Sequence, residues 1–278
     1  MDPTYALTAA VIWAFSPIYY KTFLDKFNFL SLNLLRTSVA ATVLALPAYF
    51  AGNANGFTYA LLSGSITLAV GDSLFLLSIS EMGASIATPV AYIYVLLVQL
   101  TAGAVGESVP IANGVAALMV LAGIFLLSRK GDGKPRTKGV FMALTAAVVW
   151  TVGQDLIRLA TSAGGNPVAI TFCRNFAAAI ILGVVGYGTN KVKLKPSSAK
   201  GKDYGVLALV AVSDLALGSF LFVFSISIIG VATTVILTSL SPLLTQIFSR
   251  VMGKEFPSKI DFLGGLFIVS ALVIAVLF

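Results

Sequence analysis

Residues 71–83, GDSLFLLSISEMG, return later in the chain as residues 218–230, GSFLFVFSISIIG. The matching positions keep a constant offset of 147 residues and include Gly71/Gly218, Phe75/Phe222, Ser78/Ser225, Ile79/Ile226, Ser80/Ser227 and Gly83/Gly230. The same offset continues downstream without a gap and pairs Gln99 with Gln246. A register that holds over this length indicates an internal duplication.

The duplication extends upstream, where the offset changes to 137 and 138 residues. The segment AAVIWAFSP resembles AAVVWTVGQ, which places Trp13 on Trp150. The segment NLLRTSVAA resembles TFCRNFAAA, which places Arg36 on Arg174. The changed offset means only that the loops of the second copy are longer. We therefore expect two copies of one structural unit to make up nearly the whole chain.

The composition excludes an ordinary soluble protein. Apolar residues make up 58% of the 278 residues and charged residues only 10%, whereas soluble domains carry about 25% charged residues. The mean hydropathy is +0.97. Such a chain lacks the polar surface that water requires, so we expect much of its surface to face a lipid bilayer.

The charges and the missing residue types exclude further classes. The net charge is +7, but the basic residues lie in short gaps between apolar runs, so we expect no nucleic-acid partner. The chain has no histidine, the commonest metal ligand and general base, and we expect no metal and no cofactor. The single cysteine, Cys173, cannot form a disulfide within the chain.

Ten segments are long and apolar enough to be membrane spans, for which about 20 mainly apolar residues are needed. They are residues 4–22, 30–50, 57–80, 84–105, 110–128, 138–158, 167–188, 204–228, 231–251 and 259–278. Long apolar runs without a period of two favour helices over a barrel, and lipid admits only these two structures. We therefore predict an all-α integral membrane protein with ten transmembrane helices.

Each copy of the duplicated unit holds five of these spans. The first repeat covers residues 1–128, the second covers residues 139–278, and residues 129–138 connect them. Because five is an odd number, the second repeat must enter the membrane from the opposite side. The sequence thus predicts two inverted five-helix repeats, an architecture that secondary transporters commonly build around a site at the membrane midplane.

The lysine and arginine residues predict the orientation, because cytoplasmic loops carry an excess of them. Arg158 alone lies on one face of the predicted bundle. The opposite face carries Lys21, Lys26, Arg129, Lys130, Lys134, Arg136, Lys138, Lys191, Lys193, Lys195, Lys200, Lys202, Arg250, Lys254 and Lys259. We predict a multi-pass protein of the cell membrane with both termini outside and with residues 129–138 and 190–203 in the cytoplasm.

Several motifs occur twice and in the same order. The first span has AVIWAFSPIYYK and the sixth has AVVWTVGQDLIR, while an arginine early in the second helix recurs in the seventh. A Gly-Glu connection after the fourth helix, VGESVP, returns as MGKEFP, where Lys254 separates the glycine from Glu255. These motifs resemble the drug/metabolite transporter superfamily, specifically its ten-helix EamA-like members.

That resemblance implies transport of small metabolites, often amino acids or other polar solutes, by alternating access. It also implies that both termini lie in the cytoplasm, whereas the charge bias places them outside, and we follow the charges. The expected partners are a small-molecule substrate, the lipid bilayer and a coupling proton. The alternatives are a channel or non-transporting membrane subunit, and a membrane-embedded enzyme, which would need clustered catalytic side chains.

Arg36 and Arg174 stand about two turns inside apolar spans, where a charged side chain is costly. Two interpretations fit this position. The long side chains reach back to the membrane interface, or they face an internal cavity and bind an anionic group such as a carboxylate.

Three acids also lie inside predicted spans. Asp72 and Asp214 have no acidic counterpart in the other repeat, since Asp72 aligns with Ser219 and Asp214 with Thr67. Both are candidate coupling or cavity acids, and the alternative is a buried hydrogen-bonded acid that holds helices together. Asp155 is a third candidate, although its spacing from Arg158 on the same helix also suits a simple ion pair.

The fourth and ninth spans each carry a polar stripe on one face. Tyr92 and Gln99 belong to the first stripe and Gln246 to the second, so they face either a cavity or a neighbouring helix as hydrogen-bonding partners. Two prolines, Pro89 and Pro242, are candidate gating points because proline kinks helices. The last candidates for substrate contact are the paired tryptophans Trp13 and Trp150, for which interfacial anchoring is the alternative.

Overall fold

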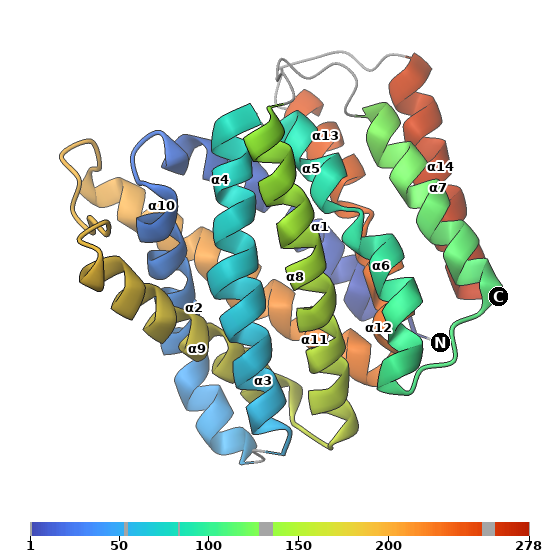
Figure 1. The fold of residues 1–278 in the computed structure, drawn as a ribbon, viewed down its shortest axis with the longest axis horizontal. Coiled ribbons are helices and arrows are strands. Elements are labelled where there is room, and N and C mark those ends of the chain that lie inside the picture. Colours follow the sequence, from blue (N-terminus) through green and yellow to red (C-terminus); the bar gives the residue numbers. More distant parts are fainter. Residues whose placement is uncertain (1, 53–54, 83, 128–135, 252–258, 278) are drawn as a thin grey trace.

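The computed structural model describes residues 2–52, 55–82, 84–127, 136–251 and 259–277, and the regular structure in these residues is helical throughout. Figure 1 shows the helices running between the two ends of the molecule, where short connections join them. Five helical runs are long and apolar enough to cross a membrane: Phe29–Ala51, Phe57–Met82, Thr137–Ser162, Pro167–Gly188 and Gly201–Ile229. The prediction of an all-α membrane protein is confirmed.

The helices coincide with the predicted spans. The first repeat contains α1 (Thr4–Leu24), α2 (Phe29–Ala51), α3 (Phe57–Gly64), η1 (Ser65–Gly71), α4 (Asp72–Met82), α5 (Ala84–Ala91), α6 (Tyr94–Thr101), η2 (Ala102–Val105) and α7 (Ile111–Leu127). The second contains α8 (Thr137–Ser162), α9 (Pro167–Gly188), α10 (Gly201–Ala211), η3 (Val212–Gly218), α11 (Ser219–Ile229), α12 (Val231–Thr238), α13 (Ser241–Val251) and α14 (Lys259–Leu277). In each repeat the third span is one continuous run of three segments, and the fourth is divided into short helices.

Local capping explains where the second helix of each repeat begins. The side chain of Asn28 accepts a hydrogen bond from the Ser31 N–H at 2.8 Å, which satisfies one free donor at the start of α2. The side chain of Asn166 does the same for the Val168 N–H at 2.9 Å, and Pro167 occupies the first position of α9, where no N–H is needed.

The third span of each repeat contains a π-helical segment at the equivalent place. These segments, η1 and η3, are related by the repeat offset of 147 residues. A π segment disturbs the regular backbone hydrogen-bond pattern, and a buried asparagine of the second helix compensates in both repeats. The Asn33 amide donates to the Leu68 carbonyl at 2.7 Å, and the Asn175 amide donates to the Leu215 carbonyl at 3.1 Å. Both repeats thus keep the π-helical segment and the asparagine that bonds to its backbone.

The two repeats are inverted and interleaved. In Figure 1, α6 ends and α7 begins at one end of the molecule, whereas the equivalent helices α13 and α14 end and begin at the other. Equivalent helices pack as pairs, α2 on α9 and α7 on α14. Each first helix packs on the other repeat, because α1 lies against η3 and α11 while α8 lies against η1 and α4. This exchange makes the two repeats one folding unit.

The duplicated stretch itself forms the contact between the repeats. A Cβ atom added at Gly71 would lie 2.7 Å from the Trp150 ring, and one added at Gly218 would lie 2.6 Å from the Trp13 ring. Only glycine therefore lets each tryptophan approach the opposite repeat. The same rings meet the phenylalanine one turn further along, at centroid distances of 5.0 Å for Phe75–Trp150 and 5.1 Å for Trp13–Phe222.

Gly230 separates the third span of the second repeat from the fourth, as the sequence predicts. It has φ of +83°, a left-handed value that favours glycine. The fourth span is itself broken between α12 and α13, and Pro242 is the second residue of α13. Proline is tolerated in the first helical turn because the N–H it lacks has no helical partner there. Pro242 therefore begins a helix instead of kinking a continuous one.

Candidate functional site

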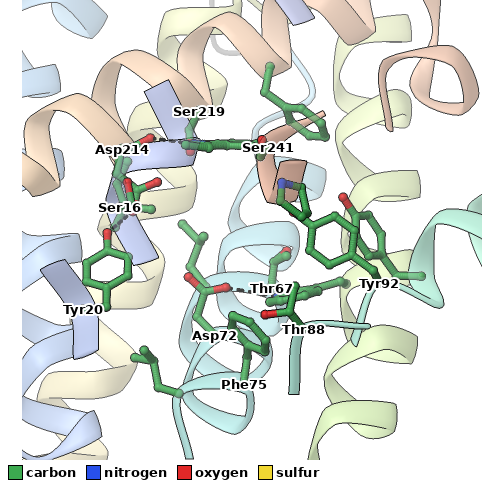
Figure 2. A pocket seen from close by; sticks show the side chains of 18 of the residues that line it. Ser16, Tyr20, Thr67, Asp72, Phe75, Thr88, Tyr92, Asp214, Ser219 and Ser241 are labelled. Atoms are coloured by element: carbon green, nitrogen blue, oxygen red, sulfur yellow. Dashed lines mark hydrogen bonds between the residues drawn. The ribbon is translucent and has the colours of Figure 1, made fainter. Parts of the chain in front are cut away.

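A cavity of about 400 Å³ lies between the two repeats at mid-depth. This volume falls in the range of small-molecule sites, which are about 300–1,000 Å³. Seven aromatic side chains and eleven polar or charged ones line it, together with aliphatic residues, and both repeats contribute to each set. Figure 2 shows Tyr20 and Asp214 at one side, Thr88 and Tyr92 at the other, and Asp72 between them.

The cavity extends toward one end of the molecule only. Tyr20, Ile79, Thr88 and Leu127 line it from within about two helical turns of the end where α7 ends and α8 begins. At the opposite end, the nearest described lining residues are Arg174 and Phe222, each seven residues, or about two turns, from the end of its helix. Toward the opposite end, α6 packs against α12, and both contribute apolar side chains, such as Val98 and Val235, to the largest apolar cluster.

Arg36 is the centre of a buried ionic cluster at the cavity wall. Its side chain is 5% exposed, and its Nη2 atom lies 3.0 Å from a carboxylate oxygen of Asp214 and 3.5 Å from one of Asp72. The Tyr20 ring lies under the guanidinium, 4.1 Å from its central carbon to the ring centroid. Burial strengthens each of these attractions, because the local dielectric constant is low. One cation thus holds carboxylates from both repeats.

Hydrogen bonds orient both carboxylates. The Tyr20 hydroxyl donates to Oδ2 of Asp214. The Trp150 indole N–H donates to Oδ1 of Asp72 at 3.1 Å, and the Trp13 indole N–H donates to the backbone carbonyl of Asp214 at 3.1 Å. Both predicted tryptophans therefore line the cavity, and the interpretation of these residues as interfacial anchors is wrong.

Arg174, the repeat counterpart of Arg36, has different surroundings. It is 3% exposed and lines the cavity, and its Nε atom donates to the Ser63 hydroxyl at 3.1 Å. Among the residues that the structure describes, Arg174 has no carboxylate within ion-pair distance, and its Nη1 atom has no hydrogen-bond partner. Because both arginines are buried at the cavity, the interpretation that they reach back to the membrane interface is wrong.

The repeat symmetry explains why the two arginines differ. Under the 147-residue offset, the position of Asp214 in the second repeat corresponds to Thr67 in the first, and that of Asp72 corresponds to Ser219. Thr67 and Ser219 both line the cavity. Arg36 therefore has two carboxylates as partners, whereas the equivalent positions around Arg174 offer only hydroxyl groups. Of the two arginines at the cavity, Arg36 is paired with acids and Arg174 is not, within the part of the chain that the structure describes.

Two of the predicted site residues lie away from the cavity. Gln99 is buried in α6, and its amide donates to the Ala232 carbonyl of α12 at 3.1 Å, so it connects helices of the two repeats. Asp155 lies on α8 and does not line the cavity. The expected ion pair between Asp155 and Arg158 is not what the structure has, because Arg158 turns to Glu107 at 2.8 Å. Spacing along one helix could not reveal a partner that comes from a loop of the other repeat.

Four predicted site residues remain. Tyr92 and Pro242 line the cavity. Pro89 lies inside α5, directly before a tightened turn in which the Ile93 N–H bonds to the Val90 carbonyl, but its ring is outside the described atoms. The side chain of Gln246 is likewise outside them.

Some cavity residues escaped the sequence interpretation. The sequence does not indicate Tyr20 as a partner of Arg36, because an aromatic residue near a helix end is typical of an interfacial anchor. Gln154 lines the cavity four residues after Trp150, on the same helix face. Thr67 and Ser219 could have been predicted as cavity residues, because each aligns with an acid of the other repeat, Asp214 and Asp72 respectively. No group of three or more potential ligands for a metal ion occurs within the described ranges.

Comparison with known proteins agrees with this architecture. Residues 3–129 and residues 137–277 each match the EamA-like transporter family. An uncharacterized transporter of Archaeoglobus fulgidus is 27% identical over 285 residues, an alignment that covers 98% of this chain and 96% of that protein. A crystal structure of another protein superimposes with a TM-score of 0.81 at 20% identity, covering 99% of this chain and 96% of the other, which shows a shared fold. The chain therefore belongs to the EamA-like transporter family, and it is a multi-pass membrane transporter and not an enzyme.

Proposed function

We propose that this transporter is a secondary carrier that moves a small carboxylate-bearing metabolite, such as an amino acid, by alternating access. The observation that carries the proposal is Arg174, a buried cation at the cavity with an unpartnered Nη1 atom and no carboxylate within ion-pair distance among the described residues. A buried charge without a partner is costly. A substrate carboxylate would supply the missing partner through a bidentate pair.

The lining of the cavity supports a solute that is polar at one end and apolar at the other. Arg174 and Asp72 offer opposite charges, which suits a zwitterion. Aromatic rings on the facing walls, including Tyr92, Phe75 and Phe222, suit an apolar or aromatic side chain. A pocket with a few polar groups on a mainly apolar wall is the usual form of a small-molecule site.

Alternating access is supported by the inverted repeats and by the one-sided cavity. Because the repeats are inverted, exchanging their conformations would close the present end of the cavity and open the other. The charge bias assigns the present end to the cytoplasm, since α7 ends and α8 begins there and the sequence between them is rich in lysine and arginine.

The acids of the Arg36 cluster are the candidates for ion coupling. Asp72 and Asp214 share one guanidinium, so the group carries one excess negative charge when both are ionised. Uptake of a single proton would balance this charge. We propose that a proton taken up here accompanies the substrate.

The test is flux into proteoliposomes that contain the purified protein. A thermal-shift screen against amino acids, sugars and organic acids first selects the solute. We expect saturable uptake and counterflow, and we expect Arg174→Gln to reduce carboxylate uptake at low concentration by at least about tenfold, because removal of one partner of a buried charge pair costs about 2–5 kcal/mol.

The control is Arg174→Lys, which keeps the charge but cannot form a bidentate pair. Lysine should restore only part of the uptake. Full activity of Arg174→Gln with a carboxylate substrate would refute the assignment of Arg174. Unsaturable conductance without counterflow would instead indicate a channel.

A further inference from the structure

The Gly-Glu connection between the fourth and fifth spans of the first repeat is not part of the cavity, yet its acid is almost fully buried. Glu107 has a side chain that is 8% exposed. It lies at the end of the molecule opposite to the one toward which the cavity extends, because α7 separates it from the connector between the repeats. A buried carboxylate requires partners, and those of Glu107 all belong to the second repeat.

Glu107 binds the beginning of α12. Its two carboxylate oxygens accept hydrogen bonds from the backbone N–H groups of Val231, at 2.6 Å, and Ala232, at 3.1 Å. The first N–H groups of a helix lack partners within the helix and carry partial positive charge, so a carboxylate is well suited to them. All eight residues of α12 are buried. The helix that Glu107 holds is therefore part of the packed wall at this end.

Glu107 also binds the end of α8. The Nε atom of Arg158 lies 2.8 Å from Oε1 of Glu107, and its Nη1 atom donates to the carbonyl of Ile226 in α11 at 3.5 Å. A Cβ atom at Gly230, between α11 and α12, would lie 2.7 Å from Oε1 of Glu107, so only glycine admits the carboxylate there. Glu107 of the first repeat thus binds two helices of the second, α12 and α8, and Arg158 links α8 to a third, α11.

We propose that Glu107 is the latch that closes this end of the transport pathway. The proposal depends on the alternating-access cycle proposed above. Opening this end requires α12 and α8 to separate from the loop of the first repeat, and that movement breaks two charge-assisted hydrogen bonds and one ion pair together. The latch therefore stabilises the conformation in which the cavity reaches only the connector end, and its release accompanies opening of the opposite end.

The test measures access to the latched end without using any substrate. In a Cys173→Ala background, Val235→Cys places one thiol in the middle of α12, at a position that is 0% exposed. Labelling by a membrane-impermeant maleimide is followed in right-side-out and inside-out vesicles. Glu107→Gln should increase labelling from the Glu107 side about tenfold, which corresponds to about 1.4 kcal/mol, because an amide removes the charge and accepts fewer hydrogen bonds.

The matched control is Glu81→Gln. Glu81 also forms ion pairs, with Lys138 at 2.6 Å and Arg136 at 3.6 Å, but these lie at the connector end and join α4 to the start of α8. This variant should leave labelling from the Glu107 side unchanged. Arg158→Gln, which keeps both bonds to α12, should give a smaller increase than Glu107→Gln.

A double variant in which the two charges are exchanged, Glu107→Arg with Arg158→Glu, shows whether the bonds of Glu107 to α12 matter or only its ion pair with Arg158. It restores opposite charges but offers α12 no carboxylate at residue 107, so labelling should stay high. Full rescue by the exchange, or a lowered melting temperature of Glu107→Gln with unchanged labelling, would overturn the proposal. Because the assay needs no solute, its result is independent of the uptake measurements. The proposal for Glu107 can be refuted while that for Arg174 stands, and the proposal for Arg174 can be refuted while that for Glu107 stands.

Discussion

Arg36 and Arg174 occupy equivalent positions in the two repeats, but only Arg36 has carboxylates as partners. Asp214 lies 3.0 Å from Arg36 and Asp72 lies 3.5 Å from it, whereas Arg174 has a hydroxyl partner, Ser63. The same residue type thus has two roles. Arg36 holds acids of both repeats, and we propose that Arg174 binds the carboxylate of the substrate.

These different roles predict different effects of the same substitution on stability. Arg36→Gln leaves two buried carboxylates without a cation, and breaking a buried ion pair in this way costs about 3–5 kcal/mol. We expect a clearly lowered melting temperature of the detergent-solubilised protein, measured by fluorescence-detected size-exclusion chromatography. Arg174→Gln breaks no ion pair among the described residues, so it should change the melting temperature little.

A double substitution checks the cause. Adding Asp214→Asn to Arg36→Gln removes one of the stranded charges, and it should recover part of the lost melting temperature. If both single arginine variants were equally unstable, the distinction between the two residues would be wrong.

At the scale of elements, the contact of each first helix with the opposite repeat depends on a glycine. α1 meets the segment that starts at Gly218, and α8 meets the segment that starts at Gly71. Each contact places a tryptophan where its indole N–H reaches Asp214 or Asp72. The helix contact and the wall of the cavity are therefore made by the same atoms.

Gly218→Ala should disturb this contact. The added Cβ would lie 2.6 Å from Nε1 of Trp13, and such overpacking costs about 1–3 kcal/mol. We expect a lower melting temperature, with a blue or red shift of tryptophan fluorescence as the ring moves.

Gly205→Ala is the matched control in the same span. A Cβ atom there meets nothing within 4 Å, and alanine in a helix is favoured over glycine by about 0.5–1 kcal/mol. This variant should keep or raise the melting temperature. Equal losses in both variants would mean that the space around Trp13 is not limiting.

At the scale of the whole molecule, the inverted repeats place both termini at the same end, as Figure 1 shows. The loop at 190–203 and the connector between the repeats hold most of the lysine and arginine residues, and this bias predicts which end is cytoplasmic. The cavity would then face the cytoplasm, and the Glu107 latch would face the outside.

Two single cysteines test this orientation in a Cys173→Ala background. Ser197 and Ser162 are both exposed but lie at opposite ends of the molecule. We expect Ser197→Cys to react with an impermeant maleimide only in inside-out vesicles and Ser162→Cys only in right-side-out vesicles. The reverse pattern would show that the charge bias mispredicts the orientation, although the inverted architecture would remain.

The sequence by itself determined the class of protein, the ten spans, the duplication and the inversion, because these depend on composition, hydrophobic length and an odd number of spans. It also pointed to the cavity acids, the arginines and the tryptophans, since polar residues are costly inside apolar helices. Only the tertiary structure decided which charge meets which. Asp214, which binds Arg36 from the opposite repeat, is 178 residues away in the sequence, and the partners of the Glu107 side chain also belong to the opposite repeat. Such pairings depend on how the repeats pack together, which no local pattern records.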